Sequence, residues 1–407
     1  MRRAVLWISA AAAVVLVLAS LPLIWKLGVR LLENTRHGAE GDPVPIQTAD
    51  LSGSGPGTLV SAMTMPSFTR TGDGKLVQAA RVVYRSTSGD TGLETVVSGS
   101  VFTPLGTPPD GGWPVVALGH GTTGINEPCA PSGSDSLLGF STAVAGFAKM
   151  GYAVALADYQ GLGAAGVHPY TDAKTAGLNM IDSVRALRHT FKNVSNRWAA
   201  VGGSQGGGAS WAADEQAATY APELNLVGAL AYSPAVDISG MVDKSQARTL
   251  TDDQEAAFQA IIESLARLHK DLNRDDYRRG GAAKYWDVLS ACAGPKVGDR
   301  RAAIDAVQPG DLGPVTPAAA NRLRDLLKAW ALPQQRLSAP LSVAYGGQDT
   351  YIDAQWTTDA IARACARGGT VVWQLQPDKG HGDVDIASQF AWMADRFAGK
   401  PVANECP

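Results

Sequence analysis

The sequence predicts an α/β fold with a mostly parallel sheet, flanking helices and one inserted helical cap. Between residues 113 and 232, short continuous apolar runs alternate with helical stripes, as expected of strands that are buried on both faces. From residue 237 to residue 335, apolar residues recur at helical spacing instead, and the alternation resumes at residue 341. One sheet interrupted by one helical insertion explains this order of segments.

Composition narrows the classes of function. The chain has 407 residues, of which 45% are hydrophobic, so it can bury a large core. A net charge of -3 with 18% charged residues leaves no basic stripe, and we expect no nucleic-acid partner. No phosphate-binding or dinucleotide fingerprint stands between a strand and a helix, so we expect no cofactor. His381, Asp383 and Asp385 lie close in sequence, but no second cluster completes a metal-ligand set, and we expect no metal.

The N-terminus predicts export. Arg2 and Arg3 precede an apolar run over residues 4–25, which as a helix would span about 33 Å. That length suits a membrane anchor and is long for a cleaved signal peptide, although residues 18–20 offer a small-residue cleavage site. Residues 1–30 are therefore a signal peptide or an N-terminal membrane anchor. In both cases the body of the protein is secreted or lies in the cell envelope, and an anchor would add membrane association.

Four cysteines in an exported chain predict two disulfides, which can be connected in three ways. Cys365 and Cys406 both lie in the C-terminal part and are expected to pair. That leaves Cys129 for Cys292, which lies in the helical insertion. The alternative is buried free thiols, which an oxidising compartment disfavours.

The first segments lead into the core. Residues 31–60 are polar and rich in Gly, Pro and Asp, so no core is expected to begin there, and we assign residues 31–55 to a linker. The first part of the core covers residues 56–235. It opens with an antiparallel hairpin, because residues 81–85 and 93–102 are β-branched and alternating on either side of a turn.

The remaining elements follow in order. Further strands are predicted over residues 113–118, 152–157, 198–201, 226–232, 341–345 and 371–375. Helices are predicted over residues 141–150, 173–191, 354–366 and 383–397. The cap takes residues 236–336, and the second part of the core takes residues 337–407. A strand, helix, strand order implies right-handed parallel crossovers.

Residues 198–208 run from an apolar segment into a glycine-rich one that carries Ser204. Gly202 and Gly206 flank Ser204 with the spacing of a nucleophile elbow, a sharp turn from strand to helix with one serine at its tip. Such a turn strains the serine's backbone. The next helix, predicted over residues 209–220, points its N-terminus at the serine and favours an oxyanion there. The alternative is an ordinary glycine-rich loop, because five-residue motifs recur by chance.

A serine nucleophile needs a base within hydrogen-bond reach, and the base needs an orienting acid. Both are expected to follow the serine, acid first. Only His269 and His381 follow Ser204. His381 lies beyond the strand over residues 371–375, at the carboxyl end where catalytic groups gather, and is the predicted base. His269 lies in a polar stretch of the cap, where a solvated helix face explains it better.

Asp349 is the predicted acid. It lies in the loop after the strand over residues 341–345, and Gly346 and Gly347 permit the tight turn that aims it across the sheet edge. Asp353 is the competitor in the same loop. Because it begins the next helix, it is more simply an N-terminal capping residue.

Two backbone N–H groups are expected to face the oxygen of a tetrahedral intermediate. Gln205 supplies one, next to the nucleophile, and Thr122 supplies the second, from the glycine-rich loop over residues 119–124. His120 lies in that loop on the oxyanion side, so a structural role is expected for its ring. Residues 158–163 close another strand at the same edge, where they line the pocket or simply form a loop turn.

In this order, the motifs resemble the secretory lipases, an α/β-hydrolase family of exported fungal and bacterial enzymes. The resemblance runs from residue 55 to the C-terminus and is carried by residues 119–124, 158–163, 202–206, 346–349 and 380–382, with residues 56–59 and 83–86 in support. It implies an α/β-hydrolase fold, hydrolysis of carboxylic esters including acylglycerols, a triad of Ser204, Asp349 and His381, two disulfides, and a cap over an acyl-binding tunnel. The fungal enzymes are cleaved and released, whereas this N-terminus is long enough for an anchor.

The favoured function is therefore an exported serine carboxylic-ester hydrolase, which cleaves acylglycerols or other lipid esters through an acyl-enzyme without a cofactor. We expect a monomer. A short-chain esterase or an acyltransferase on the same scaffold is the alternative, followed by a serine peptidase. A catalytically dead envelope binding protein is less favoured, because nothing would require it to keep Ser204, Asp349 and His381.

Overall fold

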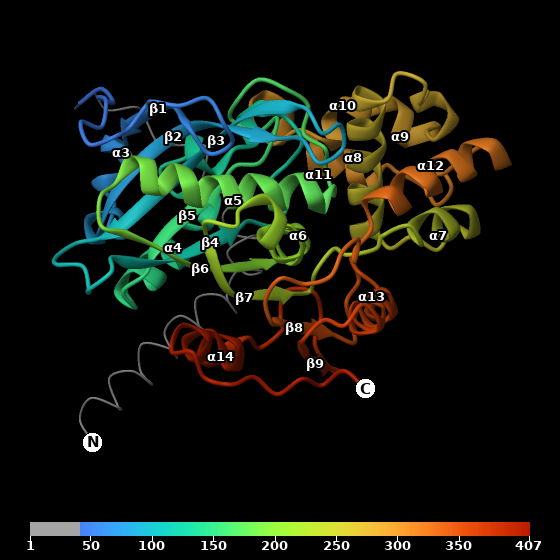
Figure 1. Ribbon diagram of the computed structural model, residues 1–407. Helices are drawn as coiled ribbons and strands as arrows, with labels where there is room; N and C mark the ends of the chain where they lie inside the picture. Colours follow the sequence, from blue (N-terminus) through green and yellow to red (C-terminus); the bar gives the residue numbers. More distant parts are fainter. Residues whose placement is uncertain (1–40) are drawn as a thin grey trace.

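A computed structural model describes residues 41–407 (Figure 1). The predicted signal peptide or anchor over residues 1–30 lies outside the described residues. Within residues 41–407 the strands are β1 Leu59–Thr64, β2 Val77–Thr87, β3 Glu94–Pro104, β4 Trp113–Gly119, β5 Ala153–Ala157, β6 Val194–Gly203, β7 Asn225–Tyr232, β8 Leu341–Gly346 and β9 Val371–Gln376. They form one sheet in the order β1-β2-β3-β5-β4-β6-β7-β8-β9. From β5 to β9 all neighbours are parallel, and β1, β2 and β3 extend the sheet antiparallel.

The helices of the same residues are α3 Pro66–Thr69, α4 Ser141–Lys149, α5 Ala173–Thr190, α6 Gln205–Tyr220, α7 Met241–Ala247, α8 Asp252–Leu268, α9 Gly280–Lys284, α10 Trp286–Leu289, α11 Arg300–Asp305, α12 Pro317–Trp330, α13 Ala354–Ala366 and α14 Ala387–Phe397. The sequence predicts the helix after Ser204 from residue 209, but α6 begins at Gln205. Residues 206–208 are glycines, whose low helix propensity argues against a helix in this first turn. Tertiary packing stabilises the turn all the same. For the last helix the predicted start at residue 383 is also wrong, because α14 begins at Ala387.

The linker expected over residues 31–55 is not separate from the core where the structure describes it. The N–H of Ile46 donates to the carbonyl oxygen of Ala62 in β1. Leu59 in β1 is 1% exposed, which fits a core that starts at residue 56 but not the expectation that no core begins within residues 31–60. The reason is the position of this segment at the sheet edge, where only one side of a strand is buried and the residues are otherwise polar.

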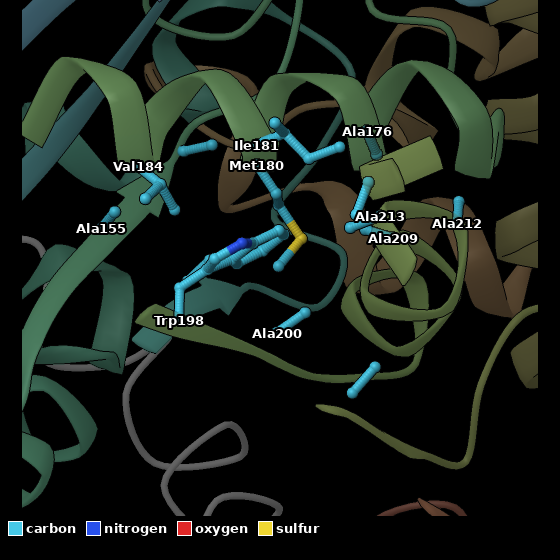
Figure 2. Packing of buried hydrophobic residues seen from close by; sticks show 14 of the residues in the cluster. Ala155, Ala176, Met180, Ile181, Val184, Trp198, Ala200, Ala209, Ala212 and Ala213 are labelled. Carbon is cyan, nitrogen blue, oxygen red and sulfur yellow. The ribbon is translucent and has the colours of Figure 1, made fainter. Parts of the chain in front are cut away.

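Helices cover both faces of the sheet. Val115 and Ala117 of β4 belong to the core under α5, α6 and α13, whereas Val116 and Leu118 belong to the core under α4 and α14. This alternation follows from the two-residue period of a strand that is buried on both faces. Figure 2 shows the indole of Trp198, from β6, beneath α5 and beside Met180; neither side chain is exposed.

The contact between α5 and α6 is close because small residues line it. Figure 2 shows Ala176 on one side and Ala209, Ala212 and Ala213 on the other. A Cβ added at Gly177 would lie 2.6 Å from the backbone nitrogen of Ala213, so only glycine allows this approach. Because α6 begins directly after Ser204, the packing of α6 on α5 and the sheet also fixes the turn that carries the serine.

The inserted cap consists of α7 to α12, between β7 and β8, and its helices lie together at one side of the sheet (Figure 1). The cap has its own hydrophobic core, in which Phe258, Ile261 and Leu265 of α8 are packed with Leu323 and Leu327 of α12. These residues are the apolar stripes visible in the sequence. The same cluster includes Ile125, Tyr170 and Ile352 from loops at the sheet edge, so the cap also packs against these loops.

Both expected disulfides form. Cys129–Cys292 joins the chain after β4 to the cap, and Cys365–Cys406 joins α13 to the C-terminal tail. Among residues 41–407, none of the helices combines the length and the apolar character that a membrane span requires.

Candidate active site

The site residues predicted from the sequence follow neighbouring parallel strands. Thr122 follows β4, Ser204 follows β6, Asp349 follows β8, and His381 follows β9. Because these strands run parallel, their carboxyl ends lie at the same edge of the sheet. The fold thus brings residues from four distant parts of the chain to one place.

Ser204 stands at a strained turn. Its backbone has φ 57° and ψ -122°, as the elbow interpretation requires. A Cβ added at Gly202 would lie 2.1 Å from the carbonyl oxygen of Gly206, and one added at Gly206 would lie 2.1 Å from that of Gly119. Glycine at both positions therefore lets β6, α6 and the loop after β4 meet. The Ser204 N–H donates to the carbonyl oxygen of Tyr232 at 3.0 Å, which holds the turn against β7.

A continuous line of hydrogen bonds joins Ser204, His381 and Asp349. Nε2 of His381 lies 2.8 Å from Oγ of Ser204, and Nδ1 lies 2.7 Å from Oδ2 of Asp349. The other carboxylate oxygen, Oδ1, accepts the N–H groups of Tyr351 and Ile352 at 2.8 and 2.9 Å. A carboxylate held in this way keeps the proton on Nδ1, so the lone pair of Nε2 faces the serine hydroxyl. The arrangement can accept a proton from Ser204.

Two further residues hold His381 and were missed in the sequence. Oγ of Ser233 donates to the carbonyl oxygen of His381 at 2.9 Å. The ring of Tyr351 packs against the imidazole with centroids 4.7 Å apart. Ser233 directly follows β7, so its place at the same sheet edge was the signal that could have found it. The contact of Tyr351 depends on the path of its loop and left no signal in the sequence.

The competing carboxylate, Asp353, has a different role from the predicted one. It precedes α13 but makes no side-chain capping bond there. Its Oδ1 instead accepts from Nζ of Lys244 at 2.8 Å and from Nε2 of Gln254 at 2.9 Å. Because Lys244 and Gln254 bind the carboxylate of Asp353, it does not accept a hydrogen bond from the first N–H groups of α13. Asp353 therefore ties α7 and α8 to the loop that carries Asp349.

The other histidine candidates lie elsewhere. His269 directly follows α8, and its Nε2 lies 3.8 Å from the carboxylate of Asp90. Its side chain is only 23% exposed, so the expected solvated face is wrong. His120 is fully buried, with ring nitrogens 2.6 and 3.1 Å from the carbonyl oxygens of Gly121 and Asp158, and burial lowers its pKa. Its surroundings are those of a structural residue.

The two expected oxyanion residues come from different parts of the chain, Gln205 directly after Ser204 and Thr122 far before it. Gln205 is the first residue of α6, so its N–H has no acceptor within the helix and belongs to the positive end of the helix dipole. Thr122 lies in the loop after β4. A Cβ added at its neighbour Gly121 would lie 3.9 Å from Cβ of Ser204, which places this loop against Ser204.

Residues 158–163 form a turn, one of the two readings left open by the sequence. The Asp158 carboxylate is buried, which raises its pKa, and it accepts from Oγ of Ser98 at 2.5 Å and from the N–H of Ser132 at 2.8 Å. It therefore joins strand β3 to the loop after β4. Among residues 41–407, no group of three or more His, Cys, Asp or Glu side chains is placed to bind a metal.

The sheet order, the helices on both faces and the serine at the strained turn define an α/β hydrolase. The family model of the secretory lipases matches residues 140–405, and the chain belongs to this family. A probable inactive lipase from Mycobacterium tuberculosis is 26% identical over 353 residues, covering 81% of this chain and 75% of that protein.

Solved structures share the fold. Candida antarctica lipase A in its closed state matches with a TM-score of 0.68 and 18% identity, covering 88% of this chain and 85% of that chain. The rice cell wall degrading esterase LipA from Xanthomonas oryzae matches with a TM-score of 0.63 and 22% identity, covering 84% and 95%. The resemblance seen in the sequence motifs is thus confirmed at the level of family and fold.

Proposed function

We propose that the protein is an exported serine carboxylic-ester hydrolase that cleaves acylglycerols or other lipid esters through an acyl-enzyme. The observation that carries this proposal is the hydrogen-bonded line from Ser204 through His381 to Asp349, with bonds of 2.8 and 2.7 Å. Membership of the secretory lipase family supports the ester substrate. The family and the two disulfides support export.

In the first half of the reaction, Nε2 of His381 takes the proton of Ser204 while Oγ attacks the carbonyl carbon of the ester. The negative charge on the former carbonyl oxygen is stabilised by the N–H groups of Gln205 and Thr122. As the tetrahedral intermediate breaks down, His381 returns the proton to the leaving alcohol. Asp349 stabilises the imidazolium that forms in between.

In the second half, His381 removes a proton from water, and the hydroxide oxygen attacks the acyl carbon. The new intermediate releases the carboxylic acid, and His381 returns the proton to Oγ of Ser204. The serine proton leaves with the alcohol and a proton from water replaces it, so the proton balance closes without a cofactor.

The cap is proposed to cover the acyl chain. We assign the core to residues 56–235 and 337–407 and the cap to residues 236–336. The contacts of Asp353 with Lys244 and Gln254 hold the cap beside the loop of the acid, which supports a cap placed over the site. The partner is then a lipid or ester substrate, and we propose a monomer.

A second candidate is a binding protein with an inactive hydrolase fold, because one relative is named a probable inactive lipase. A hydrolysis assay separates the two candidates. In purified protein, we expect Ser204→Ala to lower the rate of p-nitrophenyl ester hydrolysis by about 10⁴-fold or more, since alanine has no hydroxyl that could form the acyl-enzyme. The thermal midpoint should change little.

Ser210→Ala is the matched control. Ser210 lies in the same helix, is fully buried, and its hydroxyl has no partner within residues 41–407. This variant should keep the parent rate. Preserved turnover in Ser204→Ala, or an inactive parent protein, would contradict the proposal. A series of esters of increasing chain length would then distinguish a lipase from a short-chain esterase.

A further inference from the structure

The loop between β5 and α5 passes both residues proposed to stabilise the oxyanion. Two of its side chains, His168 and Tyr170, are 2% and 5% exposed and were not singled out by any motif in the sequence. Each makes one hydrogen bond to a proposed oxyanion residue. The mechanism described above uses neither of them.

His168 binds the side chain of Gln205. Its Nδ1 lies 2.8 Å from the carbonyl oxygen of Gln160, and its Nε2 lies 2.9 Å from Nε2 of Gln205. Burial lowers the pKa of His168 to about 3, so the imidazole is neutral and carries one proton. A carbonyl oxygen can only accept, which places this proton on Nδ1. Nε2 is therefore the acceptor for the Gln205 amide.

Tyr170 binds the side chain of Thr122. The two hydroxyl oxygens lie 2.8 Å apart. This bond leaves the backbone N–H of Thr122 free to face the substrate, because it uses only the side chain. Other side-chain bonds also join the loop after β4 to the loop after β5, including those of His120 and Ser132 with Asp158, and this one lies at Thr122 itself.

One serine of the cap fixes both residues. Oγ of Ser264, in α8, donates to the carbonyl oxygen of His168 at 2.5 Å and accepts the N–H of Tyr170 at 2.9 Å. Ser264 is fully buried. The cap is thus connected through two short hydrogen bonds to the residues that hold Gln205 and Thr122.

We infer that His168 and Tyr170 are positioning residues, which hold the backbone N–H groups of Gln205 and Thr122 in place for the oxyanion, and that Ser264 couples this placement to the cap. The inference rests on the proposed ester hydrolysis. A displacement of an oxyanion donor by about 1 Å weakens a bond that is strongest in the transition state, so the loss falls on kcat more than on KM.

A double-mutant cycle tests the bond between Tyr170 and Thr122. Tyr170→Phe and Thr122→Val each remove one hydroxyl and keep the backbone N–H of residue 122. We expect each to lower kcat about tenfold with little change in KM, and the double variant to lose no more than either single variant. Additive losses, or a loss that appears in KM, would show that Tyr170 meets the substrate directly and would overturn the inference.

Tyr345→Phe is the matched control for this cycle. Tyr345 is 3% exposed, and its hydroxyl lies 2.8 Å from Oγ1 of Thr358 in α13, so the variant breaks a similar buried pair away from the oxyanion loop. It should keep the parent kcat. If it loses as much activity as Tyr170→Phe, the effect is one of general packing and the inference fails.

Ser264→Ala tests the connection to the cap. We expect a lower kcat and an unchanged position of the pH profile of kcat/KM, because His168 stays neutral and takes no proton in the reaction. A shifted profile, or an unchanged kcat, would overturn this part. The parent enzyme separates the two proposals: an inactive parent contradicts the hydrolase assignment, whereas an active parent with fully active Tyr170→Phe and Ser264→Ala variants contradicts only the positioning.

Discussion

At the scale of single residues, the carboxylate of Asp349 decides which nitrogen of His381 faces the serine. Oδ2 lies 2.7 Å from Nδ1 of His381, while Oδ1 is occupied by the N–H groups of Tyr351 and Ile352. The two N–H groups need an oxygen as acceptor. An asparagine at position 349 would therefore place its oxygen at the Oδ1 position and its NH2 group next to Nδ1 of His381. The imidazole would then carry its proton on Nε2 and could not accept one from the serine.

We therefore expect Asp349→Asn to lower kcat for ester hydrolysis by about 10³- to 10⁴-fold with little loss of thermal stability. Asp353→Asn is the matched control, since Asp353 lies four residues on and binds Lys244 and Gln254 instead. It should stay within a few-fold of the parent rate. Equal losses in the two variants would show that the loop, and not the carboxylate of Asp349, is what matters.

How far the sequence predicts the site depends on where each residue lies along the chain. Ser204, Asp349 and His381 could be found because each follows a strand in the order that the fold imposes. His168 and Ser264 could not, because their contacts with the site depend on how a long loop folds back and how a cap helix lies over it. Such contacts join residues 37 and 96 positions apart and leave no local pattern.

At the scale of elements, α6 has two ends with different roles. Its first residue, Gln205, directly follows Ser204. Near its other end, Oδ1 of Asp214 accepts the N–H groups of Ser338 and Ala339 at 2.9 and 2.8 Å. Oε2 of the adjacent Glu215 accepts two further N–H groups from residues 334 and 335. Residues 334–339 connect the cap to β8, so α6 links Ser204 to the segment in which the chain leaves the cap.

These two carboxyls make stability depend on pH. Burial raises the pKa of Asp214 to about 8 and that of Glu215 to about 7. Both values exceed those of the unfolded chain, near 4, so the folded protein holds these protons more tightly. The resulting stability is fully present below about pH 4 and is lost as the pH rises through 7 to 8.

We therefore expect the thermal midpoint of the parent to fall between pH 6 and pH 9, and to fall less in the double variant Asp214→Asn with Glu215→Gln. The difference in the fall should be about 2–6 °C, measured by circular dichroism at constant ionic strength. The thermal midpoints of the parent and the double variant at pH 5 serve as the control, since both carboxyls of the folded parent are protonated at that pH. Parallel curves for the two proteins would contradict this account.

Elements also show where sequence patterns fail. The strands from β4 to β9 were predictable because each contains a short, mostly apolar run, although Gln374 interrupts that of β9. The first turn of α6 was not, because residues 206–208 are glycines, which disfavour a helix and here allow the backbone of α6 to approach the rest of the fold. Residues 44–50 were not either, since an edge segment has too few buried residues to show an apolar pattern.

At the scale of the whole molecule, the cap and the core are held together near the site. Cys129–Cys292, the contacts of Asp353 and those of Ser264 all join the cap to loops at the carboxyl edge of the sheet. The cap therefore carries restraints on the acid loop, on the loop after β4 and on the loop after β5. A movement of the cap would act on the reacting groups through these contacts.

Every step of the proposed reaction requires that the hydroxyl of Ser204 is an activated nucleophile. Treatment of the intact protein with a fluorophosphonate, followed by mass spectrometry of the peptides, tests this activation, because the reagent requires a serine that a neighbouring base has activated. We expect one adduct, on Ser204, which disappears in His381→Ala. An unlabelled Ser204, or an adduct on another residue of the parent protein, would contradict it.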